Sequence, residues 1–412
     1  MNSCTSERRI RMKNKNRVLI IGAGASGLFA AITAAGYGAE VTVLEKEKNA
    51  GRKLLRTGNG RCNLTNVGDP SFAYHGTDRT FAEKILHAFS PTDAIASFTK
   101  MGIYTTNRDG WIYPHSDTAE SVLTVLLWRA KELHVKIKYC EQVRRIEKNE
   151  DCFKVFTDTW HYETDKIILA CGTAASLTEK QLPANGYDLA VQMGHSVIRP
   201  LPALVPLKVK DASRFKWAGV RVAAGVSLYA DDLFIGTSHG QVQLTDSGIS
   251  GIPVFALSGQ ALRLLEGRLN VHAVLDFFPE MSEEAFAGFL KKRKNDHPDR
   301  KISDLLVGIL PERLLHAVSM ELQGSTDPEM LSHVVKNFNV RITGSQGFPC
   351  AQCTSGGVST AEVSADTCES LVMKGFYLTG EVLDIDGECG GWNLQFAWST
   401  GYLAGKHAAE VL

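Results

Sequence analysis

The apolar positions near the start of the chain form two short β-rich runs separated by an Ala- and Leu-rich helical pattern. The runs are Val18 to Ile21 and Val41 to Leu44, and the helical pattern begins at Ser26. Residues 18–39 carry no charge and follow a basic leader, as they would in a signal peptide or a membrane anchor. Because the apolar period changes from strand to helix and back, the segment predicts a β-α-β unit and not a spanning helix.

Three glycines stand at the turn between the first run and the helical pattern, in the spacing GxGxxG. Gly22 permits a tight turn, Gly24 lets the backbone approach a pyrophosphate, and Gly27 allows the helix to pack closely on the strand. The amino terminus of the helix then faces the phosphates. Glu45 ends the second run, where a carboxylate can bind the two hydroxyls of an adenosine ribose. The unit is therefore predicted to bind the adenosine half of a dinucleotide.

A loop rich in glycines and cations, Lys46 to Asn66, follows this acid. Its backbone N–H groups and charges can clamp a diphosphate, although a solvated, turn-rich loop is the alternative. The glycines are Gly51, Gly58 and Gly60, and the cations are Arg52, Lys53, Arg56 and Arg61.

The middle of the chain changes its pattern several times. Residues 78–101 and 118–133 predict helices, and residues 135–158 alternate as a β-meander does. Ile167 to Ala170 is apolar on both faces, which predicts a strand inside a covered parallel sheet. From about His195 short β stretches punctuated by Gly and Pro predict a small antiparallel sheet or barrel, and residues 259–337 then read as helical.

The last segment returns to a strand, a glycine-rich turn and a helix. Phe376 to Thr379 is the strand, and a helix begins at about Asn393. Between them stand the carboxylates Glu381 and Asp384, which can bind ribityl hydroxyls. A second helix amino terminus suits the pyrimidine end of a flavin, because it stabilises the negative charge of the reduced ring. We therefore predict FAD, held by both ends of the chain.

Five regions follow from these patterns. Residues 1–16, polar and basic, predict a disordered arm, and we expect that translation can begin at Met12 within it. The other regions are the first part of the FAD domain at 17–194, an inserted β domain at 195–258, an inserted helical domain at 259–344 and the second part of the FAD domain at 345–412.

Composition favours small-molecule chemistry. Lys plus Arg and Asp plus Glu number 45 each, so no global field attracts nucleic acid or anionic lipid, and we expect neither as a partner. Nine scattered cysteines predict reduced thiols and a cytoplasmic protein. Cys350 and Cys353 make only half of a zinc site, so we expect no metal. A redox dithiol stays open, with incidental spacing the favoured interpretation.

The quoted pieces resemble the BaiN-like (YhiN-like) family of NAD(P)/FAD-dependent oxidoreductases. The resemblance covers residue 17 to the end and is carried by "GAGASGLFAA", "GRKLLRTGNGRCNLTN", "RPLPALVPLKV", "LTDSGISG" and "GEVLDIDGECGGWNLQFAWSTGYLAG". It implies an α/β fold: a Rossmann-like FAD domain with a doubly wound parallel sheet in three layers, built from both chain ends, and an insert with β-barrel-like and helical parts. It implies FAD contacts at Gly22, Gly24, Ala25, Ser26, Gly27, Glu45, Lys46, Arg52, Lys53, Leu54, Gly58, Asn59, Gly60, Arg61, Asn63, Val143, Gly172, Gly380, Glu381, Asp384, Gly391, Asn393, Leu394 and Gln395.

The resemblance also implies a reaction, the reduction of a conjugated double bond in a 3-oxo-4-ene of the bile-acid or steroid kind. Two positions depart from the family pattern. Cys171 stands where we expect Thr, and Asp246 stands where relatives tend to carry His. A changed site residue can mean a changed substrate.

Hydride reduction of an enone needs a donor that polarises the carbonyl and a proton source. Tyr113 and His115 are the catalytic candidates, against the alternative that Tyr113 packs and His115 faces solvent. Cys62 and Cys389 lie in the flavin motifs, where packing is the favoured interpretation. No second GxGxxG unit follows in the insert, so we expect NAD(P)H to bind transiently as electron donor.

Three classes of function stay open at this point. The first is a reductase of activated carbon–carbon double bonds. The second is an oxidase that passes electrons from a small amine or alcohol to oxygen, and the third is a non-catalytic flavin-binding partner protein or one that modifies RNA. The lack of interleaved basic and aromatic residues counts against nucleic acid. The oligomeric state is open.

Overall fold

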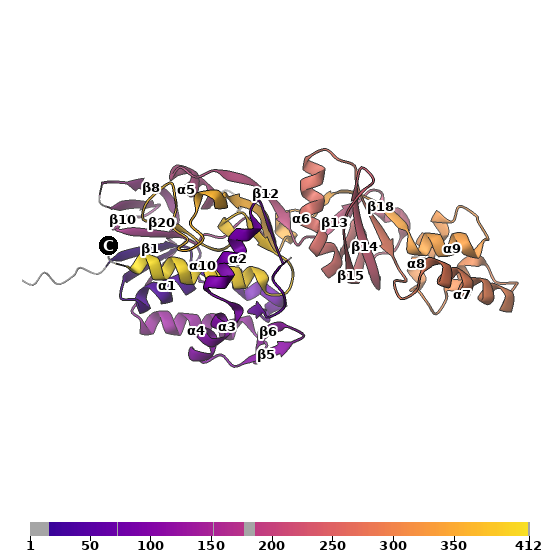
Figure 1. Cartoon of the computed structure of the whole chain (residues 1–412), viewed down its shortest axis with the longest axis horizontal. Coiled ribbons are helices and arrows are strands. Elements are labelled where there is room, and N and C mark those ends of the chain that lie inside the picture. The colour runs from indigo at the N-terminus through magenta and orange to yellow at the C-terminus, as the bar shows by residue number, and fades with distance from the viewer. Residues whose placement is uncertain (1–15, 72, 151, 177–185, 411–412) are drawn as a thin grey trace, which may run out of the picture.

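The computed structural model describes residues 16–71, 73–150, 152–176 and 186–410. The basic arm up to residue 15, with Met12, lies outside the described residues. Figure 1 shows an elongated molecule in which the indigo and yellow ends of the chain meet in one α/β domain. The middle of the chain forms a β-barrel beside this domain and a helical cap beyond the barrel.

A five-stranded parallel sheet lies at the centre of the α/β domain, in the order β20-β11-β1-β2-β7. Its inner strands are almost wholly buried, as expected for apolar runs in a sheet covered on both faces. The strands are β1 (Arg17–Ile21), β2 (Glu40–Glu45), β7 (Lys136–Tyr139), β11 (Lys166–Leu169) and β20 (Phe376–Leu378). The predicted parallel sheet, built from both ends of the chain, is confirmed.

Strand β7 corrects one part of the prediction. Its sequence alternates, so it was expected in the β-meander, but it pairs in parallel with β2 at the edge of the sheet. An exposed edge strand alternates in either kind of sheet, and its sequence therefore does not show its partner. The meander itself consists of β8 (Val143–Lys148), β9 (Phe153–Thr157) and β10 (His161–Thr164).

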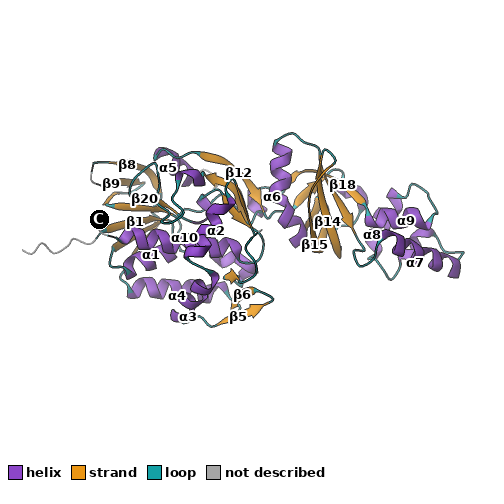
Figure 2. Ribbon diagram, viewed as in Figure 1, coloured by secondary structure: helices purple, strands orange, loops and turns teal. Residues whose placement is uncertain are grey.

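Helices cover one face of the central parallel sheet (Figure 2). The closest pair is α1 (Ala25–Gly36) and α10 (Trp392–Ala409), which join the first and last segments of the chain. A Cβ on Gly405 would meet the carbonyl oxygen of Ala30 at 2.5 Å, so the two helices touch through backbone. The remaining helices of this domain are α2 (Arg79–Ala88), α3 (Pro91–Lys100), α4 (Ala119–Glu132) and α5 (Gly186–Gln192).

Three small sheets complete the α/β domain. One contains β3 (Thr65–Asn66), β5 (Thr105–Arg108) and β6 (Trp111–Pro114). The second joins β4 (Tyr74–Gly76) to β21 (Ile385–Gly387), and the third joins β12 (Val197–Ala203) to β19 (Cys353–Val358). The last two sheets lie toward the barrel and, with helix α6 of the insert, form the junction between the two parts.

The insert is a closed barrel of six antiparallel strands, as the β-barrel prediction requires. The strands are β13 (Leu207–Val209), β14 (Arg221–Ala230), β15 (Leu233–Thr245), β16 (Gly248–Gly251), β17 (Val271–Asp276) and β18 (Phe338–Ser345). Strands β17 and β18 correct the expectation that residues 259–344 form a helical domain. Both segments alternate between buried and more exposed residues as strands do, but the helical patterns around them dominated the prediction.

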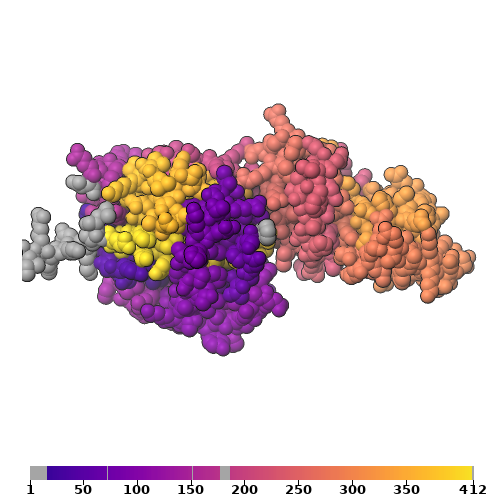
Figure 3. All heavy atoms as spheres, viewed as in Figure 1, coloured from indigo at the N-terminus to yellow at the C-terminus, as the bar shows by residue number. Residues whose placement is uncertain are grey.

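Helix α6 (Ile252–Glu266) packs on the barrel and against β12. The helical cap, at the end of the molecule far from the α/β domain in Figure 3, contains α7 (Glu283–Asp296), α8 (Glu312–Glu321) and α9 (Pro328–Lys336). Short 3-10 helices lie in loops of all three parts; they are η3 (Ala212–Phe215), η4 (Ile302–Leu306), η5 (Phe348–Cys350) and η6 (Thr360–Glu362).

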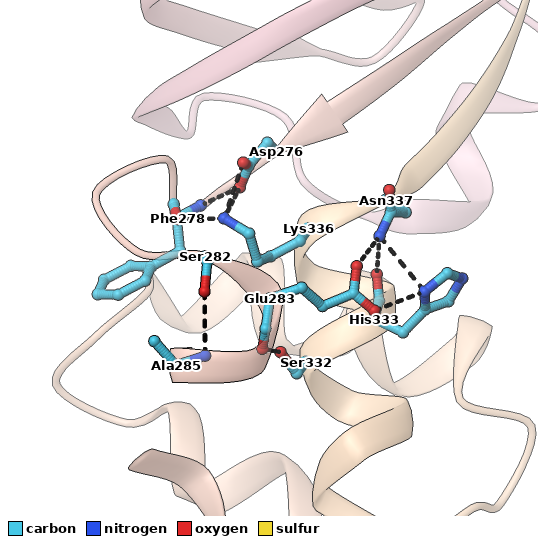
Figure 4. A network of polar contacts seen from close by, with 9 residues as sticks. All are labelled: Asp276, Phe278, Ser282, Glu283, Ala285, Ser332, His333, Lys336 and Asn337. Atoms are coloured by element: carbon cyan, nitrogen blue, oxygen red, sulfur yellow. Dashed lines mark hydrogen bonds and ion pairs between the residues drawn. The ribbon is translucent and has the colours of Figure 1, made fainter. Parts of the chain in front are cut away.

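A polar network fixes the cap to the barrel (Figure 4). Lys336 at the end of α9 donates to the carboxylate of Asp276 at 2.8 Å and to the carbonyl oxygen of Phe278 at 2.7 Å. Glu283 at the start of α7 accepts from Asn337 at 2.7 Å and pairs with His333 at 2.9 Å. These contacts join α7 and α9 to the end of β17, so the cap has one defined position on the barrel.

Candidate functional site

The turn after β1 forms an open cradle at the amino terminus of α1. Gly22 has a φ of 107°, and its N–H donates to the carbonyl oxygen of Leu44. A Cβ on Gly27 would lie 2.0 Å from the carbonyl oxygen of Gly22, whereas a Cβ on Gly24 would meet no atom within 4 Å. Gly24 is the N-cap and has no side-chain hydrogen bond. The first-turn N–H groups, including those of Ala25 and Ser26, can therefore receive an anion.

Glu45 lies beside this cradle and is only 8% exposed. One carboxylate oxygen accepts from the N–H of Ala23 at 2.8 Å, and the other accepts from the N–H of Glu47 at 2.9 Å. Each oxygen keeps a second lone pair that can accept from a ligand hydroxyl. Glu45 thus shapes the cradle and also offers acceptors at its edge.

Replacing Glu45 by Ala is expected to lower FAD retention, because the cradle loses the acceptor that holds the Ala23 N–H and the ribose loses its carboxylate. The loss of a hydrogen bond to a charged group corresponds to about 1.5 to 3 kcal/mol, or about 10- to 100-fold in affinity. The measurement is the flavin-to-protein absorbance ratio after purification, with the exposed Glu163 changed to Ala as control. An unchanged ratio in the Glu45 variant would reject its ribose role.

The predicted glycine- and cation-rich loop folds as the 3-10 helix η1 (Leu54–Gly60) with a left-handed turn at Gly58, Asn59 and Gly60. Lys53 forms an ion pair with Glu381, and the hydroxyl of Thr173 donates to the same carboxylate at 3.2 Å. The loop is therefore attached to the 3-10 helix η7 (Gly380–Val382), near the end of the chain.

Two other cations of the loop have partners in the protein. Arg52 pairs with Glu47 at 3.0 Å, and Arg56 donates to the carbonyl oxygen of Ser176 at 3.2 Å. The remaining predicted contacts also lie around this loop and the sheet end: Lys46 follows β2, Leu54 is buried, Arg61 follows η1, Val143 begins β8 and Gly172 follows β11.

The amino terminus of α10 lies beside Asn63. A Cβ on Gly391, the N-cap, would meet the side-chain oxygen of Asn63 at 2.8 Å. Asn63 is buried, and neither its amide nitrogen nor its amide oxygen has a hydrogen-bond partner. A buried amide with an unused donor and acceptor fits a ligand edge that carries both.

The side chains of two predicted contacts in α10 make hydrogen bonds within the protein. The amide of Asn393 bonds the backbone N–H and carbonyl of Gly387, at 2.9 and 2.7 Å. Gln395 is fully buried and bonds Thr65, Ser399 and the carbonyl oxygen of Phe89. The side chain of Gln395 is fully engaged inside the protein, so at this position the backbone is the group that can face a ligand. Leu394, between them, is partly buried.

The two catalytic candidates both lie beside Thr106 but differ in burial. Tyr113 is 9% exposed, its ring lies against Gly58, and burial raises its pKa. His115 is exposed, and its Nδ1 lies 3.1 Å from the hydroxyl of Thr106. His115 therefore faces solvent, as the alternative interpretation of this residue expected. Tyr113 remains a candidate because it borders the glycine- and cation-rich loop at Gly58.

The cysteines among the described residues are unbridged; Cys62 and Cys353 are buried, and Cys171 and Cys389 are partly buried. Burial raises the pKa of Cys62, Cys171 and Cys389 to about 12, and it raises the pKa of Cys353 well above its usual value. Cys350 is exposed. Buried neutral thiols favour packing over redox exchange at these positions. Asp246, the other departure from the family pattern, is exposed after β15.

Sequence reasoning missed a group of polar side chains at the junction between α6 and the α/β domain. His75, Arg263, Ser355 and Asp386 line one pocket there. Asp386 lies in the quoted segment "LDIDGE", but only Asp384 was chosen from it. The pattern gave no reason to link it with His75, because the two meet only through the pairing of β4 and β21.

A family model described as the HI0933-like protein Rossmann domain matches residues 16–407. The chain belongs to the HI0933-like Rossmann family. The resemblance to BaiN-like and YhiN-like proteins, drawn from the sequence, is the same family and is confirmed. The match spans the α/β domain and the whole insert.

Two curated relatives match the HI0933-like chain over nearly its whole length. The 3-dehydro-bile acid delta(4,6)-reductase of Clostridium scindens is 40% identical, covering 96% of this chain and 99% of the relative. The ribosomal RNA dihydrouridine synthase of Haemophilus influenzae is 30% identical, covering 95% and 98%. Among solved structures, 3-ketosteroid delta1-dehydrogenase of Sterolibacterium denitrificans has a TM-score of 0.50 at 12% identity, over 96% of this chain and 99% of that one. That likeness supports the fold alone.

The HI0933-like chain is an FAD-dependent oxidoreductase, as its sequence predicted. Its substrate and its electron donor stay predictions. The expected absence of a nucleic-acid partner loses support, because relatives in the same family are named for ribosomal RNA. Within the described residues no helix is long and apolar enough to cross a membrane.

Proposed function

We propose that this protein uses FAD to reduce a carbon–carbon double bond conjugated to a carbonyl group, as in a 3-oxo-4-ene steroid or bile acid, with NAD(P)H as transient electron donor. The observation that carries the proposal is the 40% identity to a bile-acid delta(4,6)-reductase over nearly the full length of both chains. The alignment with this relative includes the cradle, the barrel and the junction between the barrel and the α/β domain.

When bound, reduced FAD supplies a hydride to one carbon of the double bond. In this proposal the free N–H groups of the first turn of α1 hold the pyrophosphate, and Glu45 accepts from the ribose hydroxyls. Asn63 and the amino terminus of α10 hold the pyrimidine edge of the flavin, which carries both donors and acceptors. The unpartnered amide of Asn63 supports this assignment.

A second candidate substrate is uracil within RNA, favoured by two relatives named ribosomal RNA dihydrouridine synthase. The chemistry is shared, because the double bond of uracil is also conjugated to a carbonyl group. The substrates differ in the surface that they need, since an RNA strand requires phosphate contacts outside the site. The equal numbers of acidic and basic residues favour the small molecule.

The test is an anaerobic titration of the yellow protein with NADH and NADPH, followed by progesterone, a 3-oxo-4-ene steroid. We expect one nicotinamide to bleach the flavin band at roughly 450 nm and the steroid to restore it. A parallel sample receives ribosomal RNA from cells that lack this protein. Recovery with RNA and not with the steroid would select the second candidate.

Air supplies a further arm of this experiment. Rapid reoxidation of the reduced flavin by oxygen, with no response to either acceptor, would favour the oxidase alternative. A flavin that stays oxidised with both nicotinamides would reject NAD(P)H as donor. No turnover with any reductant would favour a flavin-binding partner protein.

A further inference from the structure

A pocket at the junction joins the two parts of the protein. Its walls are α6 on the barrel side and the strands β4, β19 and β21 on the α/β side. The approach is close: a Cβ on Gly259 of α6 would lie 3.8 Å from a carboxylate oxygen of Asp386. The apolar part of the wall comes from Ala203, Leu204 and Phe255. The enclosed space is only about 30 Å³, so it admits the polar end of a ligand and not a whole steroid, with apolar and polar residues around that end.

Asp386 is the buried acid of this pocket. It is 4% exposed, it lines the pocket, and its Oδ1 has no hydrogen-bond partner. His75 is its register partner across the antiparallel pair β4–β21, so both side chains lie on the same face of this ribbon. Neither ring nitrogen of His75 has a hydrogen-bond partner. Buried polar atoms without partners on two facing residues of one wall indicate a site built for a ligand.

Burial and the neighbouring polar and charged side chains set the pKa of Asp386. Burial raises its pKa to about 6, Ser355 and Arg263 act in the opposite direction, and the carboxylates of Asp384 and Glu381 add to the rise. The carboxyl group therefore keeps its proton up to about pH 6, well above the range of an ordinary Asp, and can act as a general acid there.

Two further titratable groups face Asp386. The pKa of His75 is lowered, chiefly by burial, so its ring is uncharged at neutral pH, and its Nε2 lies 3.8 Å from a carboxylate oxygen of Glu388. The thiol of Cys353 is buried and neutral, because burial raises its pKa well above the usual value.

Arg263 brings a positive charge to the pocket from the insert. Its guanidinium donates to the hydroxyl of Ser355, at 2.7 Å from Nη2, and lies 3.6 Å from the carboxylate of Asp384. The side chain is part-exposed, and a guanidinium has five N–H donors, so it can also bind a carbonyl oxygen.

We propose that this junction pocket binds the substrate of the reaction, with Arg263 holding the carbonyl oxygen and Asp386 donating the proton to the α-carbon. The inference rests on the proposed function. In the balanced step the substrate gains a hydride at the β-carbon and a proton at the α-carbon, the double bond becomes single, and FAD is oxidised. Asp386 ends as a carboxylate and regains its proton from solvent. NAD(P)H restores the reduced cofactor.

The test uses the full-length holoenzyme in two readouts, with progesterone as probe. Calorimetry measures progesterone binding to the oxidised protein, and stopped-flow absorbance follows reoxidation of protein reduced with dithionite under anaerobic conditions. The variants are Asp386→Asn and Arg263→Met. Their matched controls are the exposed Asp158→Asn and Arg214→Met, whose side chains pair only at the surface in the described structure, with Arg144 and Glu321.

For Asp386→Asn we expect reoxidation to slow about 100-fold, the usual contribution of a general acid, with flavin content and progesterone affinity unchanged. The wild-type rate should fall as pH rises through about 6, because the protonated acid is lost, and the variant should lose this dependence. For Arg263→Met we expect progesterone to bind about 10- to 100-fold more weakly. Both controls should match the wild type.

The outcomes separate the two proposals. If the reduced wild-type protein is not reoxidised by progesterone, the steroid function fails and the inference fails with it. If it is reoxidised but Asp386→Asn reacts at the wild-type rate with the same pH profile, the inference alone is overturned. Unchanged progesterone binding by Arg263→Met would overturn the role of the arginine.

Discussion

Gly27→Ala is expected to give a destabilised protein that is purified without flavin. The added Cβ would lie 2.0 Å from the carbonyl oxygen of Gly22 and 3.1 Å from the Cβ of Ala170. The nearest atom belongs to the backbone of the turn, so no side chain can rotate away, and α1 must shift from the sheet. Forced overpacking of this kind costs about 3 kcal/mol or more. The shift also moves the N–H groups that are proposed to hold the pyrophosphate.

The measurements are the flavin-to-protein absorbance ratio and the melting temperature. Gly36→Ala is the matched control, because it changes the same helix and its Cβ would meet no atom within 4 Å. Gly24→Ala separates folding from binding: its Cβ also meets no protein atom, so the protein should fold, but the methyl group would stand in the cradle. A flavin-replete Gly27→Ala protein with the wild-type melting temperature would contradict the close packing of α1.

The parts of the protein that could be predicted from the sequence are those encoded by short local patterns. The unit at 17–45 combines strand, glycine turn, helix and terminal acid within one stretch, and all four are present at the expected positions. The last segment is similar, since a strand, a glycine turn and α10 follow one another. In both cases the residues that define the element are neighbours in the chain.

The errors concern pairing over long distances. Strand β7 alternates like a meander strand but pairs with β2, and β17 completes the barrel only because β14 and β18 lie on either side. The hydrogen-bond partners of the Asn393 and Gln395 side chains, namely Gly387 and Thr65, were likewise not predicted. No periodicity within these segments contains that information.

The junction pocket could not be predicted for the same reason. His75 precedes α2, Arg263 belongs to the insert, and Asp386 precedes α10. None of the three lies in a recognised spacing, and the pairing of β4 with β21 and the position of α6 bring them together. The sequence did identify the loop containing Asp386, but a choice between Asp384 and Asp386 requires their hydrogen bonds.

Asp386→Asn is expected to stabilise the protein at about pH 8 even though it removes the proposed acid. Burial raises the pKa of Asp386 from 3.8 to about 6 in the folded protein. A raised acid pKa means that the folded state disfavours the carboxylate, so stability falls as pH rises from the unfolded value through the folded one. The buried carboxylate therefore lowers the free energy of unfolding by its full amount above about pH 6 and not at all below about pH 4. Removing the charge should raise the free energy of unfolding by about 1 to 3 kcal/mol at alkaline pH.

The adjacent acid provides the contrast, because Asp384→Asn is expected to change stability in the opposite direction. One oxygen of Asp384 accepts from the N–H of Thr77 at 2.9 Å and from its hydroxyl at 2.6 Å, and the other faces Arg263. The NH2 group of an amide at this position would face N–H or O–H donors of Thr77 or Arg263 and could not accept from them. The expected loss in the free energy of unfolding is about 1 to 3 kcal/mol. Urea unfolding of both variants at about pH 4 and pH 8 measures the difference. If Asp386→Asn is destabilised equally at both values, the carboxylate of Asp386 is not strained by burial, and the physical case for it as a proton donor is lost.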